Sequence, residues 1–194
     1  LKGKQYAQVL VSLALLVTPF NLRGFSLFQP VCFDIIFWSL IFWLTLRWIN
    51  TKSDKYLLLI GLAAGFGLLN KYLIALEIVA ILVAFVISPY RSLFSRSTFY
   101  IAILIAFVVF LPNLIWQIKN QFPVLVHMQA LNDTQLVHVN RLSFFTDQLF
   151  MGSAAIFLFI PGIIFMGFGR SLKPYRPLIA ASFTVLFGLA FLRG

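Results

Sequence analysis

The stretch Tyr56–Ile87, YLLLIGLAAGFGLLNKYLIALEIVAILVAFVI, is almost wholly apolar, with Lys71 near its middle and Glu77 six residues later. A single helix of these 32 residues would be about 50 Å long, whereas the hydrocarbon core of a bilayer is about 30 Å thick. A lysine at the bilayer centre also costs several kcal/mol. Two spans joined at Asn70-Lys71 avoid both problems, so the sequence predicts that Lys71 lies at a membrane surface.

The composition is that of a polytopic membrane protein. Hydrophobic residues make up 61% of the chain, charged residues 10%, and the mean hydropathy is +0.98. The net charge of +10 does not indicate nucleic-acid binding, because the cations lie in short loops between apolar runs. The single cysteine, Cys32, excludes an intramolecular disulfide and a multi-cysteine zinc site.

The apolar runs predict about seven transmembrane helices in one all-α bundle that covers residues 1–194. Their expected bounds are about 5–20, 32–48, 54–69, 72–87, 99–116, 150–167 and 177–192. Lysine and arginine are enriched in cytoplasmic loops, so they predict the orientation. The predicted cytoplasmic side holds ten of them: Lys2, Lys4, Arg47, Lys52, Lys55, Arg91, Arg96, Arg170, Lys173 and Arg176. The outer side holds five: Arg23, Lys71, Lys119, Arg141 and Arg193.

Two external loops are expected on the outer side, at residues 21–31 and 117–149. The longer one contains both histidines, His127 and His138, and a loop of that length is usually functional or partly structured. Within it, residues 122–130 are predicted to form a short interfacial helix. On the opposite side, Ser53 and Asp54 are candidate caps for the third span.

Small and polar residues in the apolar runs have two interpretations each. Gly61 and Gly65 form a GxxxG pattern, which favours close helix packing and leaves approach to a lipid substrate as the alternative. Lys71 is placed either to bind a phosphate or to reach lipid headgroups. Asp34 falls on the same membrane face, where the amino end of a helix would stabilise its carboxylate. Asp34 and Lys71 are therefore candidates to line one site.

Other polar residues give weaker indications. Glu77 lies about 9 Å below Lys71 along a helix and on a different face, so it is expected to meet another span or a cavity. His127 and His138 are too far apart in sequence to indicate a metal site. No cofactor is expected, no ligand spacing points to a metal, and a divalent ion is left as an open alternative.

Several segments together resemble the membrane glycosyltransferases of the GT-C class, and most closely family 39 (PMT_2, dolichyl-phosphate-mannose protein mannosyltransferase-like). The similarity covers essentially the whole chain. The segments that carry it are SLFQPVCFD at 26–34, GLAAGFGLLNKY at 61–72, LPNLIWQIKNQFP at 111–123 and LRG at 192–194.

The resemblance implies a donor sugar on a polyprenyl phosphate, bound from the outer leaflet, and a carboxylate that deprotonates the acceptor. Lys71 matches the family lysine of an LxKY element, which implies that it binds the donor phosphate. Asp34 matches the family's acidic residue on the same face. Tyr72, Trp116 and His127 are expected to line the site with it.

Two departures from the family pattern matter. The catalytic aspartate of the family lies after a first transmembrane helix, and we expect both upstream of Leu1, so the chain is interpreted as an internal fragment. The family also tends to read W-x-x-x-H-G-W-P after the fifth span. Here Asn120, Gln121 and Phe122 replace the histidine, glycine and tryptophan.

The predicted function is the core of a glycosyltransferase in the cell inner (plasma) membrane. It would transfer a sugar from a polyprenyl-phosphate donor to an acceptor glycan, lipid or protein on the outer face. Two alternatives stay open. One is a transporter or flippase of lipid-linked sugars, although no paired repeats with broken helices are recognisable. The other is a non-catalytic membrane scaffold.

Overall fold

The computed structural model describes residues 5–27, 29–134, 146, 150 and 156–193, and every regular element among them is helical. This confirms the all-α class. The α-helices are α1 (Gln5–Val17), α2 (Pro19–Ser26), α3 (Pro30–Thr51), α4 (Lys55–Asn70), α5 (Ile74–Val86), α6 (Ser97–Lys119), α7 (Pro123–Thr134), α9 (Ile156–Phe168) and α10 (Arg176–Arg193). Two 3₁₀ helices, η1 (Pro89–Ser95) and η3 (Arg170–Tyr175), connect α5 to α6 and α9 to α10.

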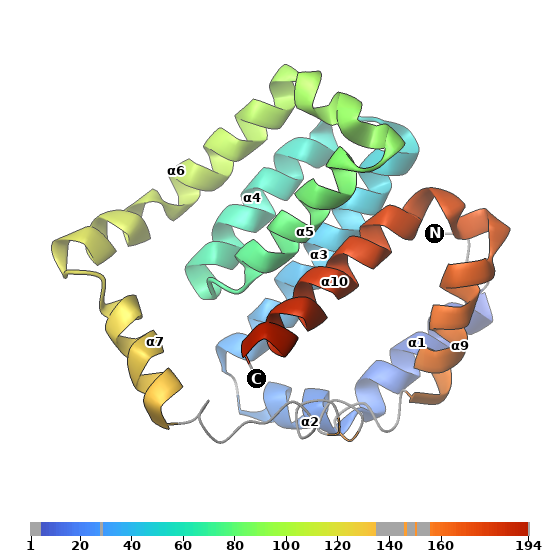
Figure 1. Ribbon diagram of the computed structural model, residues 1–194, viewed down its shortest axis with the longest axis horizontal. Coiled ribbons are helices and arrows are strands. Elements are labelled where there is room, and N and C mark those ends of the chain that lie inside the picture. Colours follow the sequence, from blue (N-terminus) through green and yellow to red (C-terminus); the bar gives the residue numbers. More distant parts are fainter. Residues whose placement is uncertain (1–4, 28, 135–145, 147–149, 151–155, 194) are drawn as a thin grey trace.

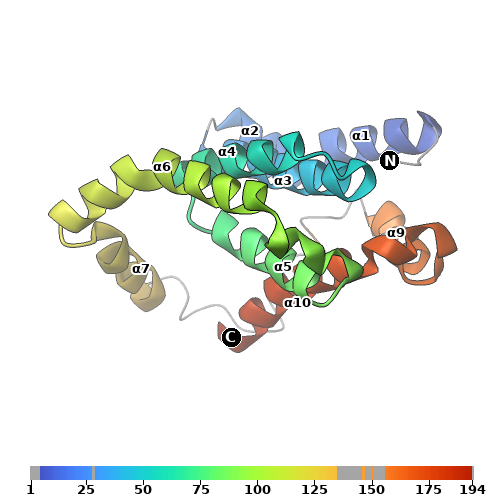
Figure 2. The same cartoon turned by 90° about the horizontal axis from the view of Figure 1, so that it is seen from above.

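Five helices form a two-layered bundle. In one layer α4 lies between α3 and α6, and in the other α5 packs along α10 (Figures 1 and 2). The core between the layers contains Ile41 and Trp48 from α3 and Ile74 and Phe85 from α5, all with 3% of their surface exposed or less. The Trp48 and Phe85 rings meet edge to face, 5.4 Å apart. Burial of these large side chains fixes how the two layers face each other.

The predicted packing role of the GxxxG glycines agrees with the contacts between α4 and α6. A Cβ atom on Gly61 would overlap the backbone of Ala102, including its carbonyl oxygen. A Cβ atom on Gly65 would lie 2.7 Å from Cβ of Val109. The missing side chains therefore let the two helix backbones approach closely, as small residues do in membrane helix pairs.

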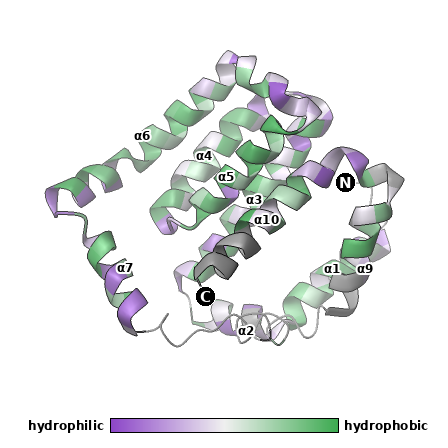
Figure 3. Ribbon diagram, viewed as in Figure 1, coloured by the Kyte–Doolittle hydropathy of each residue, from purple (hydrophilic) through white to green (hydrophobic). Residues whose placement is uncertain are grey.

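Apolar side chains cover much of the outer surface. Two helices, α3 and α6, are long and apolar enough to cross a membrane, and the bent pair of α5 and η1 would make three among the described residues. Only 6% of the apolar window of α6 is buried, and the helix is hydrophobic along most of its length (Figure 3). A soluble protein rarely exposes such a surface, which suits contact with lipid tails. Helices also lie at the other five expected spans, but they are shorter than α3 and α6, so the predicted number of about seven transmembrane helices is not confirmed.

The two ends of the bundle carry different polar clusters. The end that holds the α4–α5 turn is here called the Lys71 end, and the end that holds the α3–α4 turn is called the Lys52 end. At the Lys52 end, the Lys52 ammonium lies 4.4 Å from the Trp48 ring and 4.0 Å from the Tyr90 ring. Burial and the nearby Arg96 charge lower the pKa of Lys52.

Asp54 does not act as the predicted side-chain cap of α4. Its backbone is already helical and its carboxylate makes no capping hydrogen bond. Instead Oδ1 accepts a hydrogen bond from Arg96 Nη1 at 2.6 Å, and Oδ2 accepts one from Thr98 Oγ1 at 2.8 Å. Tertiary contacts with α6 compete successfully for the carboxylate, so Asp54 connects α4 to α6.

Both predicted external loops contain helix. Residues 21–26 of the first belong to α2, which starts before the loop with Pro19, at a position where proline is favoured. In the second, α6 extends to Lys119 and α7 covers the region where a short helix was expected at 122–130. Most of the remainder of 117–149, including His138, lies outside the described residues.

The turn between α6 and α7 is conformationally unusual. Gln121 and Phe122 adopt φ values of 59° and 55°, in the left-handed region that non-glycine residues rarely occupy. The Phe122 amide donates to the Gln117 carbonyl at 2.7 Å, which closes the turn. Where the family has a glycine, this chain therefore has Gln121 in a backbone conformation that favours glycine.

Candidate functional site

The turn between α4 and α5 places Lys71 at one end of the bundle. The helix ends at Asn70, and Lys71 is extended, with its amide donating to the Gly67 carbonyl at 2.8 Å. The Asn70 side chain donates to the Pro30 carbonyl at 3.0 Å, which ties the turn to the start of α3. The polar Asn70-Lys71 pair thus interrupts the apolar run where the sequence predicted a fold-back.

Asp34 and Lys71 come together at this end. Lys71 Nζ lies 3.7 Å from Asp34 Oδ2, and the two side chains are 40% and 14% exposed. Asp34 Oδ1 also accepts a hydrogen bond from Trp38 Nε1 at 3.2 Å. The carboxylate lies beyond the first turn of α3, because the helix begins at Pro30. Its partners are therefore side chains rather than the free amides of the helix start.

Tyr72 anchors the same turn to α6. Its hydroxyl donates to Asn113 Oδ1 at 2.6 Å and accepts from Gln117 Nε2 at 2.8 Å. Gln117 is buried, and its Oε1 accepts from the Val124 amide at 3.4 Å. This network connects the Lys71 turn to α6 and to the first residues of α7. It fixes the turn that carries Lys71 relative to both helices.

Sequence reasoning did not identify Asn113 and Gln117 as members of this network. A signal was present, because they are four residues apart in an apolar helix and so share one face. Such a polar pair in a membrane helix needs partners, since lipid offers none. The sequence did not show which partner meets them, because Tyr72 is 41 residues from Asn113.

Trp116 and His127, the other expected site-lining residues, are exposed on α6 and α7. No hydrogen bond or ion pair joins their side chains to Asp34, Lys71 or Tyr72 in the described part of the chain. In Figure 1, α7 continues from the end of α6 and lies outside the five-helix bundle. The structure thus brings together Asp34, Lys71 and Tyr72, and leaves Trp116 and His127 apart from them.

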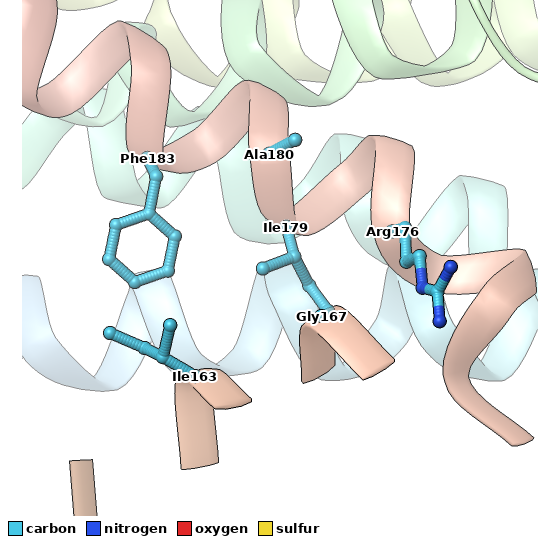
Figure 4. Close-up of a pocket in the computed structure, with 6 residues that line it drawn as sticks. All are labelled: Ile163, Gly167, Arg176, Ile179, Ala180 and Phe183. Atoms are coloured by element: carbon cyan, nitrogen blue, oxygen red, sulfur yellow. The ribbon is translucent and has the colours of Figure 1, made fainter. Parts of the chain in front are cut away.

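Two apolar cavities lie near the bundle. One of about 390 Å³ lies between α3, α4, α5 and α6, and its apolar wall includes Leu68 and Phe110. The Phe110 ring meets the Tyr72 ring edge to face at 5.9 Å, so this cavity reaches the Lys71 end. The other, of about 340 Å³, lies between α9 and α10 and contains none of the expected site residues (Figure 4). Its lining consists of Ile163, Gly167, Arg176, Ile179, Ala180 and Phe183.

No group of three or more potential metal ligands occurs among the described residues. Chemically, the Lys71 end offers one half-exposed ammonium, one adjacent carboxylate and a neutral hydrogen-bonding network. An ammonium at a membrane surface is suited to an anionic group such as phosphate. The nearby apolar cavity is suited to a hydrocarbon chain.

Comparison with known proteins connects this geometry to a family. The family model for dolichyl-phosphate-mannose-protein mannosyltransferase (PMT_2) matches residues 2–116, more than half of the chain. The match includes Asp34, Lys71, Tyr72 and the glycines of α4. No curated protein and no solved structure matches the chain. With its apolar helices suited to crossing a membrane, the chain belongs to the PMT_2 family of GT-C-type membrane glycosyltransferases.

Proposed function

We propose that this chain forms the membrane core of a glycosyltransferase that takes a sugar from a polyprenyl-phosphate donor. All seven expected segments would cross the inner membrane, with the Lys71 end on the outer face and the acceptor bound on that side. The observation that carries the proposal is the pairing of Lys71 with Asp34 beside an apolar cavity. Family membership supports the reaction class.

Lys71 would bind the phosphate of the donor. Its Nζ–Oδ2 distance of 3.7 Å to Asp34 is longer than the roughly 2.7–2.9 Å of a strong charge-assisted hydrogen bond. The ammonium therefore keeps donor capacity for phosphate oxygens. Asp34 would orient Lys71, and the hydrogen bond from Trp38 would orient Asp34. Tyr72, Trp116 and His127 remain proposed lining residues around the sugar and its acceptor.

The lipid part of the donor would occupy the cavity between α3, α4, α5 and α6. This cavity has an exclusively apolar lining and begins near the Tyr72–Phe110 ring contact. A polyprenyl chain entering there would leave its phosphate at the membrane surface near Lys71. Burial of the apolar chain would supply affinity, and the ammonium would fix the position of the phosphate.

The reaction would be a direct displacement at the anomeric carbon of the sugar. A carboxylate takes the proton from the acceptor hydroxyl as the new oxygen–carbon bond forms and the bond to the phosphate oxygen breaks. Lys71 would stabilise the negative charge that develops on the departing polyprenyl phosphate.

The test is the replacement Lys71→Ala in the intact protein, with Lys55→Ala at the Lys52 end as the matched control. We expect Lys71→Ala to lower sugar transfer by at least about 100-fold, as for loss of one electrostatic contact to a transition state. Membrane insertion and helicity should not change. Lys55→Ala should transfer sugar at the normal rate. A normal rate in the Lys71 variant would remove the phosphate-binding role.

Reconstitution in proteoliposomes distinguishes this proposal from the transporter alternative. A transferase glycosylates an acceptor on one side without moving the lipid-linked sugar between leaflets. Movement between leaflets without transfer would establish the transporter. If alanine at both Asp34 and Lys71 altered only stability, the chain would be a scaffold.

A further inference from the structure

A third cavity, of about 580 Å³, lies between α1, α3, α5 and α10, away from the apolar cavity beside α6. This volume is within the range of about 300–1,000 Å³ found for small-molecule sites. Aromatic residues of α3 form much of its lining, and Val11 and Ser182 close it from α1 and α10. The aromatic residues in this lining are Trp38, Phe42 and Trp43.

Among the described residues that line this cavity, Glu77 is the only acidic one. Glu77 is 4% exposed, and its Oε2 atom has no hydrogen-bond partner among the described residues. Burying a carboxyl group without a partner costs several kcal/mol, so such groups in membrane helices normally face a ligand or a functional cavity.

Glu77 has no ion-pair partner among the described residues, and its electrostatic neighbour Asp34 has the same charge when ionised. The Asp34 carboxylate is close enough to act on Glu77 electrostatically, and the Lys71 ammonium is already paired with Asp34. A cation bound beside Glu77 would neutralise its ionised carboxylate and satisfy the free oxygen.

The cavity walls favour the same ligand class. Aromatic faces attract cations, and Trp38 and Phe42 offer such faces in this lining. The third aromatic residue, Trp43, already has the Arg47 guanidinium 5.8 Å from its ring centroid. Trp38 lines the cavity while donating its indole N–H to Asp34. The remaining wall is largely hydrocarbon and suits an alkyl chain. We propose that this cavity binds a cationic amphiphile, with its ammonium group at Glu77 and its alkyl chain between α1 and α3.

The position of Glu77 along α5 fits an amphiphile. Glu77 is in the first turn of α5, three residues after Ile74, which corresponds to about 4.5 Å along the axis. The carboxyl therefore lies a short distance below the Lys71 end, while Leu46 in the same lining is on the later part of α3. A ligand whose ammonium group lies near the Lys71 end, at Glu77, and whose alkyl tail extends deeper, toward Leu46, would fit this arrangement.

Photo-crosslinking tests the proposal directly. The full-length protein in dodecyl maltoside micelles is exposed to dodecylammonium that bears a diazirine in its chain, and labelled peptides are mapped by mass spectrometry. We expect labels on residues 38–46 and 77–80. Glu77→Gln, which keeps the shape of the side chain, should reduce that labelling at least about 10-fold. Asp54→Asn, a matched change at the Lys52 end, should leave it unchanged.

A second variant tests the same cavity in case Glu77→Gln fails to fold. Ser39 is exposed and lines the cavity, so Ser39→Leu fills part of the space while leaving Glu77 in place. It should also reduce labelling, with unchanged helicity and melting temperature. Equal labelling of wild type and Glu77→Gln would overturn the proposal. Equal labelling by a diazirine dodecanol would also overturn it, because the site would then select a hydroxyl group or a bare alkyl chain.

Discussion

The Lys71 ammonium and the Asp34 carboxylate lie 3.7 Å apart, although Asp34 is on α3, Lys71 is in the turn between α4 and α5, and the two are 37 positions apart in the chain. The ion pair forms because α3 begins and α4 ends at the same end of the bundle. Asn70 fixes that relationship through its hydrogen bond to the Pro30 carbonyl. Two opposite charges are thereby held at a surface where the ammonium remains 40% exposed.

This exposure predicts that the ion pair contributes little to folding. In a double-mutant cycle of Asp34→Asn and Lys71→Met, we expect a coupling energy below about 1 kcal/mol. The measurement is unfolding in mixed micelles titrated with sodium dodecyl sulfate. A coupling energy of about 3 kcal/mol or more would show that the pair is structural and would weaken the case for phosphate binding.

Replacing Tyr72 with phenylalanine should destabilise the protein by about 1–3 kcal/mol, because the buried Gln117 amide and the Asn113 carbonyl oxygen both lose their partner. The ring contact with Phe110 would be kept. Tyr100→Phe is the matched control, since that hydroxyl donates to the Phe94 carbonyl at an exposed site. We expect the control to change stability by less than about 0.5 kcal/mol, measured by thermal unfolding.

Gly61→Ala should separate α4 from α6. The added methyl group would overlap the Ala102 backbone, and we expect a loss of about 1–3 kcal/mol despite the better helix propensity of alanine. Gly167→Ala in α9 is the control, because its Cβ would meet nothing within 4 Å. That variant should be neutral or slightly more stable. Similar destabilisation in both variants would contradict the packing explanation.

Gln121→Gly should stabilise the α6–α7 turn. A left-handed conformation costs a residue with a Cβ atom about 1–2 kcal/mol, and the greater chain entropy of glycine offsets about 0.5–1 kcal/mol of that gain. We expect a net stabilisation of about 0.5–1 kcal/mol in chemical unfolding. Asn120→Gly, at a φ of −106°, should not stabilise. If both variants were destabilised equally, the strain at Gln121 would be unsupported.

Asp54 predicts an acid-sensitive contribution at the Lys52 end. The hydrogen bond from Thr98, and then Arg96, lowers the pKa of Asp54 in the folded protein. The carboxylate therefore stabilises the fold above its unfolded pKa of about 3.9, and this contribution is lost as the pH falls through the lower folded pKa. The melting temperature of Asp54→Asn should be below wild type at pH 7, and the gap should begin to narrow as the pH falls below about 3.9.

A Thr98→Val variant provides the control for that pH dependence. It removes the first-named cause of the lowered pKa while leaving Arg96 in place. At pH 7 we expect the melting temperature of Thr98→Val to differ from wild type by less than that of Asp54→Asn does. This difference should also narrow in acid. A gap between wild type and Asp54→Asn that persists unchanged to pH 3 would show that the ionised carboxylate is not responsible.

Much of the architecture could be predicted because it depends on local sequence. The fold-back at Asn70-Lys71 followed from one lysine within an apolar run, and the structure has a turn there. The short interfacial helix predicted at 122–130 corresponds to α7, which begins at Pro123. The loop expected at 21–31 was wrong in part, because Pro19 starts a short helix that hydropathy alone does not reveal.

The sequence by itself determined the helical class, the membrane character and the presence of Lys71 at a helix boundary. Each of these follows from side-chain solvation and from helix length against bilayer thickness. Tertiary structure alone decided that Tyr72 meets Gln117, that Asp54 bonds Arg96 rather than capping its helix, and that Glu77 faces a cavity. Those outcomes depend on which helix faces pack together, and that choice is made by the shape of the whole core, such as the close contact that Gly61 permits between α4 and α6.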